Sequence, residues 1–119
     1  PDGLYEVLMR LHKGYGNPTL YVTENGVAFE DNVTKEGSVQ DDDRIVFIRD
    51  HLISVYRAIK DGATVKGYSV WSFSDNFEWW DGYSPRFGLV HTDYQTQKRT
   101  PKKSYYWYKQ VIANNGFAF

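Results

Sequence analysis

A glutamate follows directly on a short apolar run near the start of the chain. Residues 19–23 are β-branched, aromatic or aliphatic, and Pro18 precedes them. The run predicts a buried strand that stops at Glu24 and the Asn25-Gly26 pair. A carboxylate at the carboxyl end of a parallel strand is a common position for a catalytic group in a barrel or open α/β sheet. The alternative is a solvated glutamate that opens an Asn-Gly turn.

A second strand-like run, residues 67–73, leads into a loop rich in aromatic side chains. Trp71 offers a flat face on which a sugar ring can stack, and Glu78 and Trp79 follow within the loop. An ionised carboxylate accepts two hydrogen bonds at once, and an indole N–H donates one. The alternatives are a core tryptophan at the strand end and a solvated loop acid.

Four segments of the chain together resemble glycoside hydrolase family 1, the β-glucosidase family. The segments are YVTENG at 21–26, GYSVWSFSDNFEW at 67–79, GYSPRFGLVHTDY at 82–94 and KRTPKKSYYWY at 98–108, in the family's order. The resemblance implies an α/β fold, the C-terminal part of a (β/α)8 TIM barrel. A complete barrel needs about 250 residues. Residues 1–119 are therefore expected to hold about the last two to three β/α units, as one C-terminal fragment of the barrel.

The resemblance also implies a reaction. It identifies the chain as part of a retaining β-glycosidase that hydrolyses terminal β-linked sugars, with Glu24 as the nucleophile that forms a covalent glycosyl-enzyme intermediate. The family's acid/base glutamate lies in an Asn-Glu-Pro segment, and this sequence has none. We therefore expect the chain to be inactive without the rest of the barrel. The implied substrate is a β-glucoside or a short β-linked oligosaccharide, and no cofactor or metal is expected.

The resemblance assigns four further residues to the glycone, the sugar that is cleaved off. Trp71 matches the floor under the sugar, and Glu78 matches the acceptor of two hydroxyls at its far end. Trp79 matches a donor to a neighbouring hydroxyl, and Phe87 matches an aromatic residue near the primary alcohol.

Other residues of the same loop have different roles or depart from the family. Asp75 and Asn76 are expected to fix the loop, and Asn25 is not expected to be catalytic. Phe73-Ser74 stands where a leucine pair is typical, and Trp80 where a small or varied residue is common. These departures concern the aglycone preference and local packing, and the motif residues themselves are unaffected.

Composition restricts the class of protein. The net charge is −1, and no apolar run reaches membrane-spanning length, so neither nucleic acid nor a membrane is an expected partner. There is no cysteine, which excludes disulfides and thiol catalysis. The three histidines are far apart and lack metal-ligand spacing. The default expectation for the location is the cytoplasm.

Apolar periodicity predicts the elements that position these residues. Helices are expected near 3–13, 41–61 and 101–114, strands near 19–23 and 66–72, and a short extra strand at 89–94. Asp2 is a plausible N-cap of the first helix, and Thr100-Pro101 is the expected start of the last. The order strand, long helix, strand predicts a parallel βαβ unit.

Three acids, Asp41 to Asp43, open the long helix, where they suit the positive end of the helix dipole. A metal site is the less favoured alternative. Arg44 is expected on the solvent side of this helix.

Two further hypotheses compete with the enzyme. The chain is a sugar-binding module without catalysis, using Trp71, Glu78 and Trp79, or a half-barrel fragment that self-associates to cover an open sheet edge. The corresponding protein partner is either the missing N-terminal barrel segment or a second copy of this chain.

Overall fold

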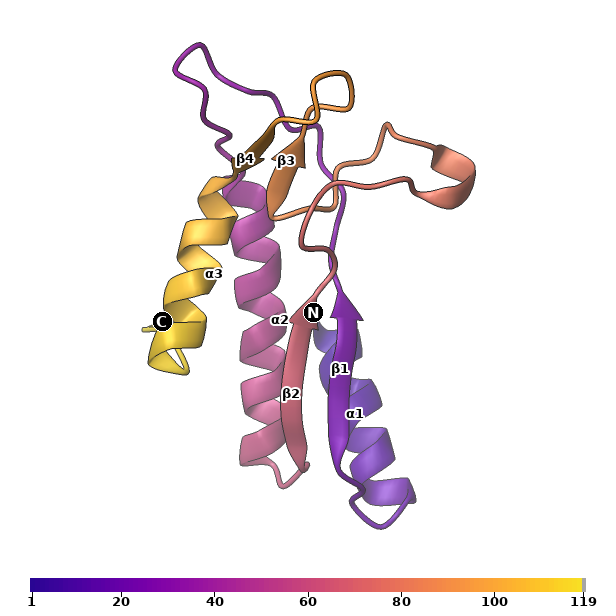
Figure 1. Cartoon of the computed structure of the whole chain (residues 1–119). Helices are drawn as coiled ribbons and strands as arrows, with labels where there is room; N and C mark the ends of the chain where they lie inside the picture. The colour runs from indigo at the N-terminus through magenta and orange to yellow at the C-terminus, as the bar shows by residue number, and fades with distance from the viewer. Residues whose placement is uncertain (119) are drawn as a thin grey trace. The chain divides into compact units, whose positions relative to one another are not determined.

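The computed structural model describes residues 1–118 and contains three α-helices, four strands and one 3-10 helix (Figure 1). They are α1 (Asp2–Gly14), β1 (Leu20–Asn25), α2 (Asp42–Lys60), β2 (Val65–Val70), η1 (Trp79–Asp81), β3 (Val90–Thr92), β4 (Arg99–Pro101) and α3 (Lys103–Asn114). The chain divides into unit 1, residues 1–25 and 46–70, and unit 2, residues 26–45 and 71–119. None of the described helices is long and apolar enough to cross a membrane.

Unit 1 contains the parallel pair of β1 and β2 predicted from the sequence (Figure 1). Helix α1 and the unit 1 part of α2 supply apolar side chains to its core. The buried core residues are Leu8, Met9, Val55, Ala58 and Ala63, and the partly buried ones packed against them include Leu20, Val22, Val65 and Tyr68. The apolar periodicity of the two helices thus predicted both elements, although Val7, Tyr56 and Ile59, which share that periodicity, are exposed.

The pairing of β1 with β2 contains a bulge at the end of β1. Val22 pairs with Tyr68 and Asn25 pairs with Val70, so Thr23 and Glu24 lie opposite the single residue Ser69. Thr23 and Glu24 are both exposed, which interrupts the alternation expected of a strand. A bulge of one extra residue re-aims the side chains that follow it, and bulges are frequent beside active sites.

Unit 2 contains an antiparallel hairpin of β3 and β4, in which Val90 pairs with Pro101 and Thr92 with Arg99. The extra strand expected at 89–94 is present but covers only Val90–Thr92. Asp93 makes the turn, because its Oδ1 accepts hydrogen bonds from the backbone N–H groups of Gln95 and Thr96 at 2.9 and 3.1 Å. These bonds lower the pKa of the Asp93 carboxyl.

Two predicted helix starts are wrong. Thr100 and Pro101 lie in β4, and α3 begins at Lys103 with Lys102 at its N-cap. Pairing with β3 overrides the local Thr-Pro signal, and proline is tolerated in a short strand at a sheet edge. Asp2 is the first residue of α1 rather than its cap, which is Pro1.

Candidate active site

Glu24 lies in the bulge of β1, in unit 1, with its side chain exposed. Within residues 1–118, no hydrogen bond or ion pair engages its carboxylate. The next residue is held in place, because the Tyr68 hydroxyl donates to Asn25 Oδ1 at 2.7 Å. The bulge therefore presents an unpartnered carboxylate beside a fixed neighbour, at the carboxyl end of a parallel strand.

Gly26 of the TENG segment is required by a close backbone approach in unit 2. A Cβ atom built on Gly26 would lie 1.7 Å from the carbonyl oxygen of Trp71 and 2.7 Å from its carbonyl carbon. Any larger residue would collide with backbone rather than with a flexible side chain. The glycine that looked like part of an Asn-Gly turn therefore packs against the tryptophan of the second motif.

Backbone hydrogen bonds bring the two ends of the loop 76–87 together. Ser72 N–H donates to Phe87 O at 3.2 Å, and Leu89 N–H donates to Ser72 O at 2.9 Å. Asp75 N–H then donates to Val90 O at 3.0 Å. Phe87 therefore lies beside Ser72, the residue that follows Trp71, and the ends of the loop are held close together.

This loop, residues 76–87, which we call the aromatic loop, carries three of the predicted glycone residues. Glu78 and Phe87 are half-buried, whereas the side chain of Trp79 is 84% exposed. Glu78 N–H donates to Gly82 O at 2.7 Å, which closes a tight turn around η1. In the described part of the chain neither the Glu78 carboxylate nor the Trp79 indole has a hydrogen-bond partner, so both are available to a ligand.

Aromatic contacts support the base of the aromatic loop. The ring of Tyr83 lies 5.3 Å from that of Phe77 and 4.6 Å from that of Tyr94. The Arg86 guanidinium stacks 4.4 Å from the centre of the Tyr94 ring. Tyr94 also donates its hydroxyl to Asn76 O at 3.3 Å, and burial raises the pKa of this phenol.

Six charged side chains form a buried cluster in unit 2, which we call the charge cluster. Its members are Asp31, Asp41, Arg44, Asp75, Arg86 and Lys102. Acids and bases alternate through it, with three of each sign. Lys102 Nζ contacts Asp31 at 2.5 Å and Asp75 at 2.9 Å, and its side chain is fully buried. Pairing of this kind is what buried charges require.

The sequence did not predict the charge cluster. The expectation that Arg44 lies on the solvent side of α2 is wrong, because Arg44 is 1% exposed and contacts both Asp31 and Asp41. Asp41 precedes α2 and also accepts hydrogen bonds from the Ser104 backbone N–H at 2.8 Å and from its hydroxyl at 2.5 Å. These contacts link segments far apart in the sequence, so no local sequence pattern predicts them.

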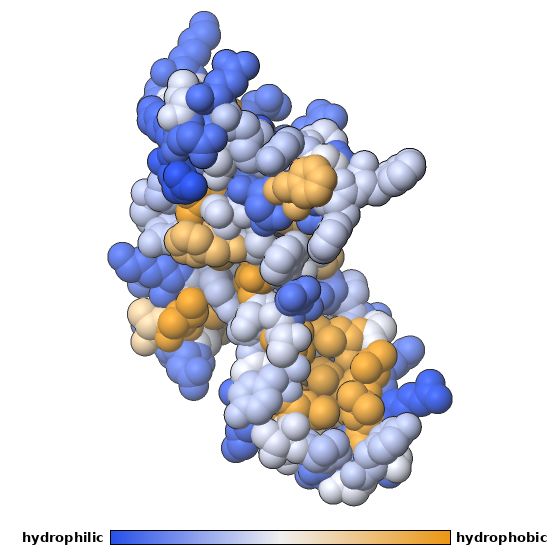
Figure 2. Space-filling model, turned by 45° about the vertical axis from the view of Figure 1, so that its right-hand side comes forward, coloured by the Kyte–Doolittle hydropathy of each residue, from blue (hydrophilic) through white to orange (hydrophobic). Residues whose placement is uncertain are grey.

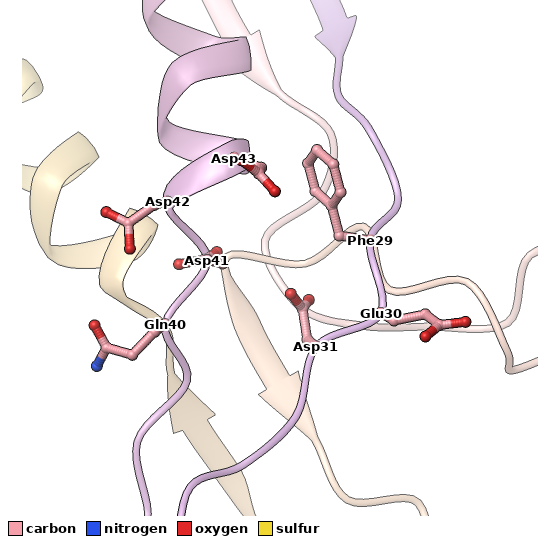
Figure 3. A pocket seen from close by; sticks show the side chains of 7 residues that line it. All are labelled: Phe29, Glu30, Asp31, Gln40, Asp41, Asp42 and Asp43. Carbon is pink, nitrogen blue, oxygen red and sulfur yellow. The ribbon is translucent and has the colours of Figure 1, made fainter.

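A pocket of about 350 Å³ lies beside the charge cluster and is lined mainly by acids (Figure 3). Its carboxylates do not point to one centre, since the side chain of Glu30 points away from that of Asp31 in Figure 3. Asp31 and Asp41 are already paired with Arg44. No group of three or more potential ligands in the described residues is arranged to hold a metal ion.

The structure places the predicted site residues in both units. Trp71, Glu78, Trp79 and Phe87 lie in unit 2, and three of them belong to the aromatic loop. Glu24 lies in unit 1, at the end of the strand whose Asn25 pairs with Val70. That Glu24 converges with the other four on one cleft stays a prediction.

Comparisons with known proteins complete the description of the site. The family model described as glycosyl hydrolase family 1 matches residues 1–117. β-Glucosidase A of Acetivibrio thermocellus is 49% identical over 117 residues, which are 98% of this chain and 26% of that protein. A 6-phospho-β-galactosidase of Leptotrichia buccalis is 52% identical over 112 residues, 93% of this chain and 24% of that protein.

A solved structure is similar to this chain in both sequence and fold. The family 1 β-glucosidase from Thermotoga maritima superposes with a TM-score of 0.97 at 48% identity, over 100% of this chain and 27% of that one. The same enzyme has been solved in complex with glucoimidazole. The chain thus spans about a quarter of the length of these relatives, and its fold is part of a (β/α)8 barrel.

Proposed function

Since this chain belongs to glycosyl hydrolase family 1, we propose that it supplies the nucleophile and part of the glycone site of a retaining β-glycosidase of the β-glucosidase type. The observation that carries the proposal is the position of Glu24. Its carboxylate is exposed and unpartnered in a strand-end bulge, within a motif whose glycine packs on the backbone of Trp71.

In the proposed reaction, the Glu24 carboxylate attacks the anomeric carbon as the bond to the leaving oxygen breaks. An acid protonates that oxygen, and water later releases the sugar from Glu24. This sequence has no Asn-Glu-Pro segment, so we place the acid outside the chain. In a retaining enzyme the two carboxyl groups lie about 5–5.5 Å apart, which requires the rest of the barrel to hold the acid opposite Glu24.

The glycone rests on Trp71 and is held at its far end by the aromatic loop. The unpartnered Glu78 carboxylate accepts hydrogen bonds from two hydroxyls, and the exposed indole of Trp79 donates to a neighbouring one. Phe87 borders the primary alcohol. Side chains without partners in the protein suit this role, because they exchange water for sugar hydroxyls without breaking internal bonds.

An unphosphorylated glycone fits these residues better than a 6-phosphoglycoside. Three basic side chains of the matching segments are already paired: Lys102 with two buried acids, Arg86 with Asp75, and Lys103 with Asp42 at 2.6 Å. A phosphate dianion at the far end of the sugar would also meet the Glu78 carboxylate, and like charges repel. Glucoside chemistry is therefore the first choice over the activity named for the Leptotrichia relative.

We propose the remaining segment of a barrel as the protein partner of this chain. Unit 1 exposes Val7 and Tyr21, and Figure 2 shows hydrophobic side chains gathered on its surface. The sheet of unit 1 has only two strands, so its edges are free to pair with further strands. Self-association would cover the same surface and is the alternative.

A hybrid barrel tests the function directly. In it, this chain replaces the matching 27% of the Thermotoga maritima β-glucosidase, to which it superposes with a TM-score of 0.97. The assay is release of nitrophenol from an aryl β-glucoside. We expect turnover by the hybrid barrel and none by the 119-residue chain alone.

Replacing the nucleophile distinguishes catalysis from binding. Glu24→Gln in the hybrid barrel should lower kcat by at least about 10⁴-fold and abolish the burst of nitrophenol, while binding of glucoimidazole persists. Glu6→Gln on α1, where the glutamate is also exposed, is the matched control and should leave kcat unchanged. A normal burst from Glu24→Gln would remove Glu24 from the nucleophile role, and sugar binding without turnover by the hybrid itself would favour the non-catalytic module.

A further inference from the structure

We propose that Asp75 is a positioning residue for the aromatic loop. Its buried carboxylate fixes both ends of the loop and so sets the place of Glu78, Trp79 and Phe87. The inference rests on the proposed function only for the identity of the ligand, a β-linked sugar whose far-end hydroxyls meet this loop.

The Asp75 carboxylate is fully buried and accepts four hydrogen bonds. Oδ1 accepts from Gly88 N–H at 2.9 Å and from Lys102 Nζ at 2.9 Å. Oδ2 accepts from Arg86 Nη1 at 3.1 Å and from Thr92 N–H at 3.3 Å. A carboxylate has about four acceptor positions, so Asp75 is saturated. One side chain thus joins the start of the loop to its end, thirteen residues later.

The donors to Asp75 are themselves anchored within unit 2. Lys102 also contacts Asp31, and Arg44 contacts Asp31 and donates to Arg86 O at 2.5 Å. The cluster is electrically balanced and largely buried, with Arg86 as its most exposed member, and buried ionic hydrogen bonds hold a charge in a well-defined geometry. Asp75 therefore transmits the position of the charge cluster to the aromatic loop.

Gly88 allows the end of the loop to contact the backbone at its start. A Cβ atom on Gly88 would lie 2.2 Å from Asp75 N and 2.4 Å from Ser74 C, so only glycine lets the end of the loop come this close to its start. Beyond this contact, residues 77–82 form hydrogen bonds within the loop itself, such as the one from Glu78 N–H to Gly82 O. The aromatic loop is held mainly at its ends, and both ends meet at Asp75.

Asp75 and Glu78 contrast in a way that separates positioning from binding. Asp75 has all its acceptor positions filled by the protein, whereas Glu78, three residues later, has no protein partner in the described chain. Asp75→Asn keeps the shape of the side chain but replaces one acceptor oxygen by an NH₂ donor. That group faces two donors whichever way the amide is turned, so at least two of the four bonds are lost.

The first test needs no enzyme activity. In ¹⁵N-labelled 119-residue chain, Asp75→Asn should speed exchange of the Gly88 and Thr92 amide protons by at least about 10-fold, the factor that corresponds to losing about 1.4 kcal/mol of local protection. The indole signal of Trp79 should shift with them. Asp81→Asn, the same change at an exposed acid of the same loop, should move neither. Unchanged exchange in Asp75→Asn would overturn the proposal.

The second test separates positioning from general loss of structure. In the hybrid barrel, Asp75→Asn should lower kcat/KM for an aryl β-glucoside by about 10²-fold, the effect of about 1 Å of misplacement. The loss for the matching β-xyloside, which lacks the hydroxymethyl group, should be at least about 5-fold smaller, because fewer of its contacts are made to the loop. A partly unfolded enzyme would lose both activities by the same factor, and that equal loss would overturn the proposal.

A milder variant covers the case in which Asp75→Asn does not fold. Arg86→Gln removes one donor to Asp75 from a side chain that is 20% exposed. It should lower kcat/KM more for the glucoside than for the xyloside, with a smaller effect than that of Asp75→Asn. Equal losses would again contradict the proposal. Failure of the proposed function has a different signature: the unsubstituted hybrid barrel would be inactive while the amide exchange of Gly88 still depended on Asp75.

Discussion

A series of glycine-to-alanine substitutions tests how this fold uses close backbone approach. At Gly26 the new Cβ would lie 1.7 Å from the Trp71 carbonyl oxygen, and at Gly88 it would meet three backbone atoms at 2.2, 2.4 and 2.7 Å. At Gly67 the nearest atom is on the ring of Tyr21 at 2.7 Å, and at Gly3 nothing lies within 4 Å. The same methyl group therefore meets backbone, a flexible ring or open space.

The expected magnitudes follow from what must move. An ordinary contact begins near 3.4 Å, so Gly26→Ala displaces residue 26 or the Trp71 carbonyl by about 1.7 Å. Overpacking of this kind costs about 3 kcal/mol or more. Gly88→Ala also disturbs the charge-assisted bond to Asp75, for a total of about 3–5 kcal/mol. At Gly67 the 64% exposed Tyr21 can rotate away, so the change stays within about 1 kcal/mol.

Gly3→Ala is the matched control, because alanine in the helix α1 should raise stability by about 0.5–1 kcal/mol. The assay is urea denaturation of the chain at constant m-value. All four tryptophans, Trp71, Trp79, Trp80 and Trp107, lie in unit 2, so their fluorescence reports on the unit that contains Gly26 and Gly88. Far-ultraviolet circular dichroism follows the helices, of which α1 and most of α2 lie in unit 1 and α3 lies in unit 2. If Gly26→Ala costs no more than Gly67→Ala, the argument from backbone contact is refuted.

Two further predictions concern buried and exposed charge. Burial first, and then the nearby Arg86, lowers the pKa of His91, although Asp75 and Asp31 act against this and Lys102 with it. The unfolded chain therefore binds the proton more readily, so the free energy of unfolding should fall as the pH drops below about 6.5. His91→Gln should flatten this pH dependence in denaturation curves recorded between about pH 5 and about pH 7. Asp41→Asn leaves Arg44 and the Ser104 donors short of an acceptor and should cost about 3–5 kcal/mol, whereas Arg57→Ala breaks only the exposed pair with Asp2 and should cost less than about 1 kcal/mol. Equal costs for these two substitutions would contradict the assignment of burial.

Apolar periodicity and the order of the elements were enough to predict the parallel pair of strands and the long helix. Ile48, Val55 and Ala58 recur at helical spacing and are buried, and the run at 19–23 became β1 with a shift of one or two residues. Such elements follow from nearby residues alone. The start of α3 was missed because pairing of Thr100 with His91 in the hairpin outweighs a local cap signal.

The bulge at Glu24 and the charge cluster were beyond sequence reasoning for a related physical reason. Whether Thr23 and Glu24 share one partner position depends on the register with Ser69, more than forty residues away. Likewise, Arg44 looked like a surface residue because its acids, Asp31 and Asp41, come from a polar loop without periodicity. The burial of a charged residue can be predicted only when the residues that pair with it in the folded protein are known.

Asp75, just before the aromatic loop, and Glu78, within it, differ in their hydrogen-bond partners. Asp75 and Glu78 are similar in chemistry and close in sequence, and the family resemblance alone assigned a sugar contact to one and a fixing role to the other. The structure supplies the physical distinction, since Gly88, Thr92, Arg86 and Lys102 all donate to Asp75 and leave it nothing for a ligand. Glu78 retains its acceptors because the tight turn to Gly82 satisfies only its backbone. An acid saturated by its own protein can orient a site, and an acid left without partners can bind, so a count of filled acceptor positions separates the two roles before any substrate is present.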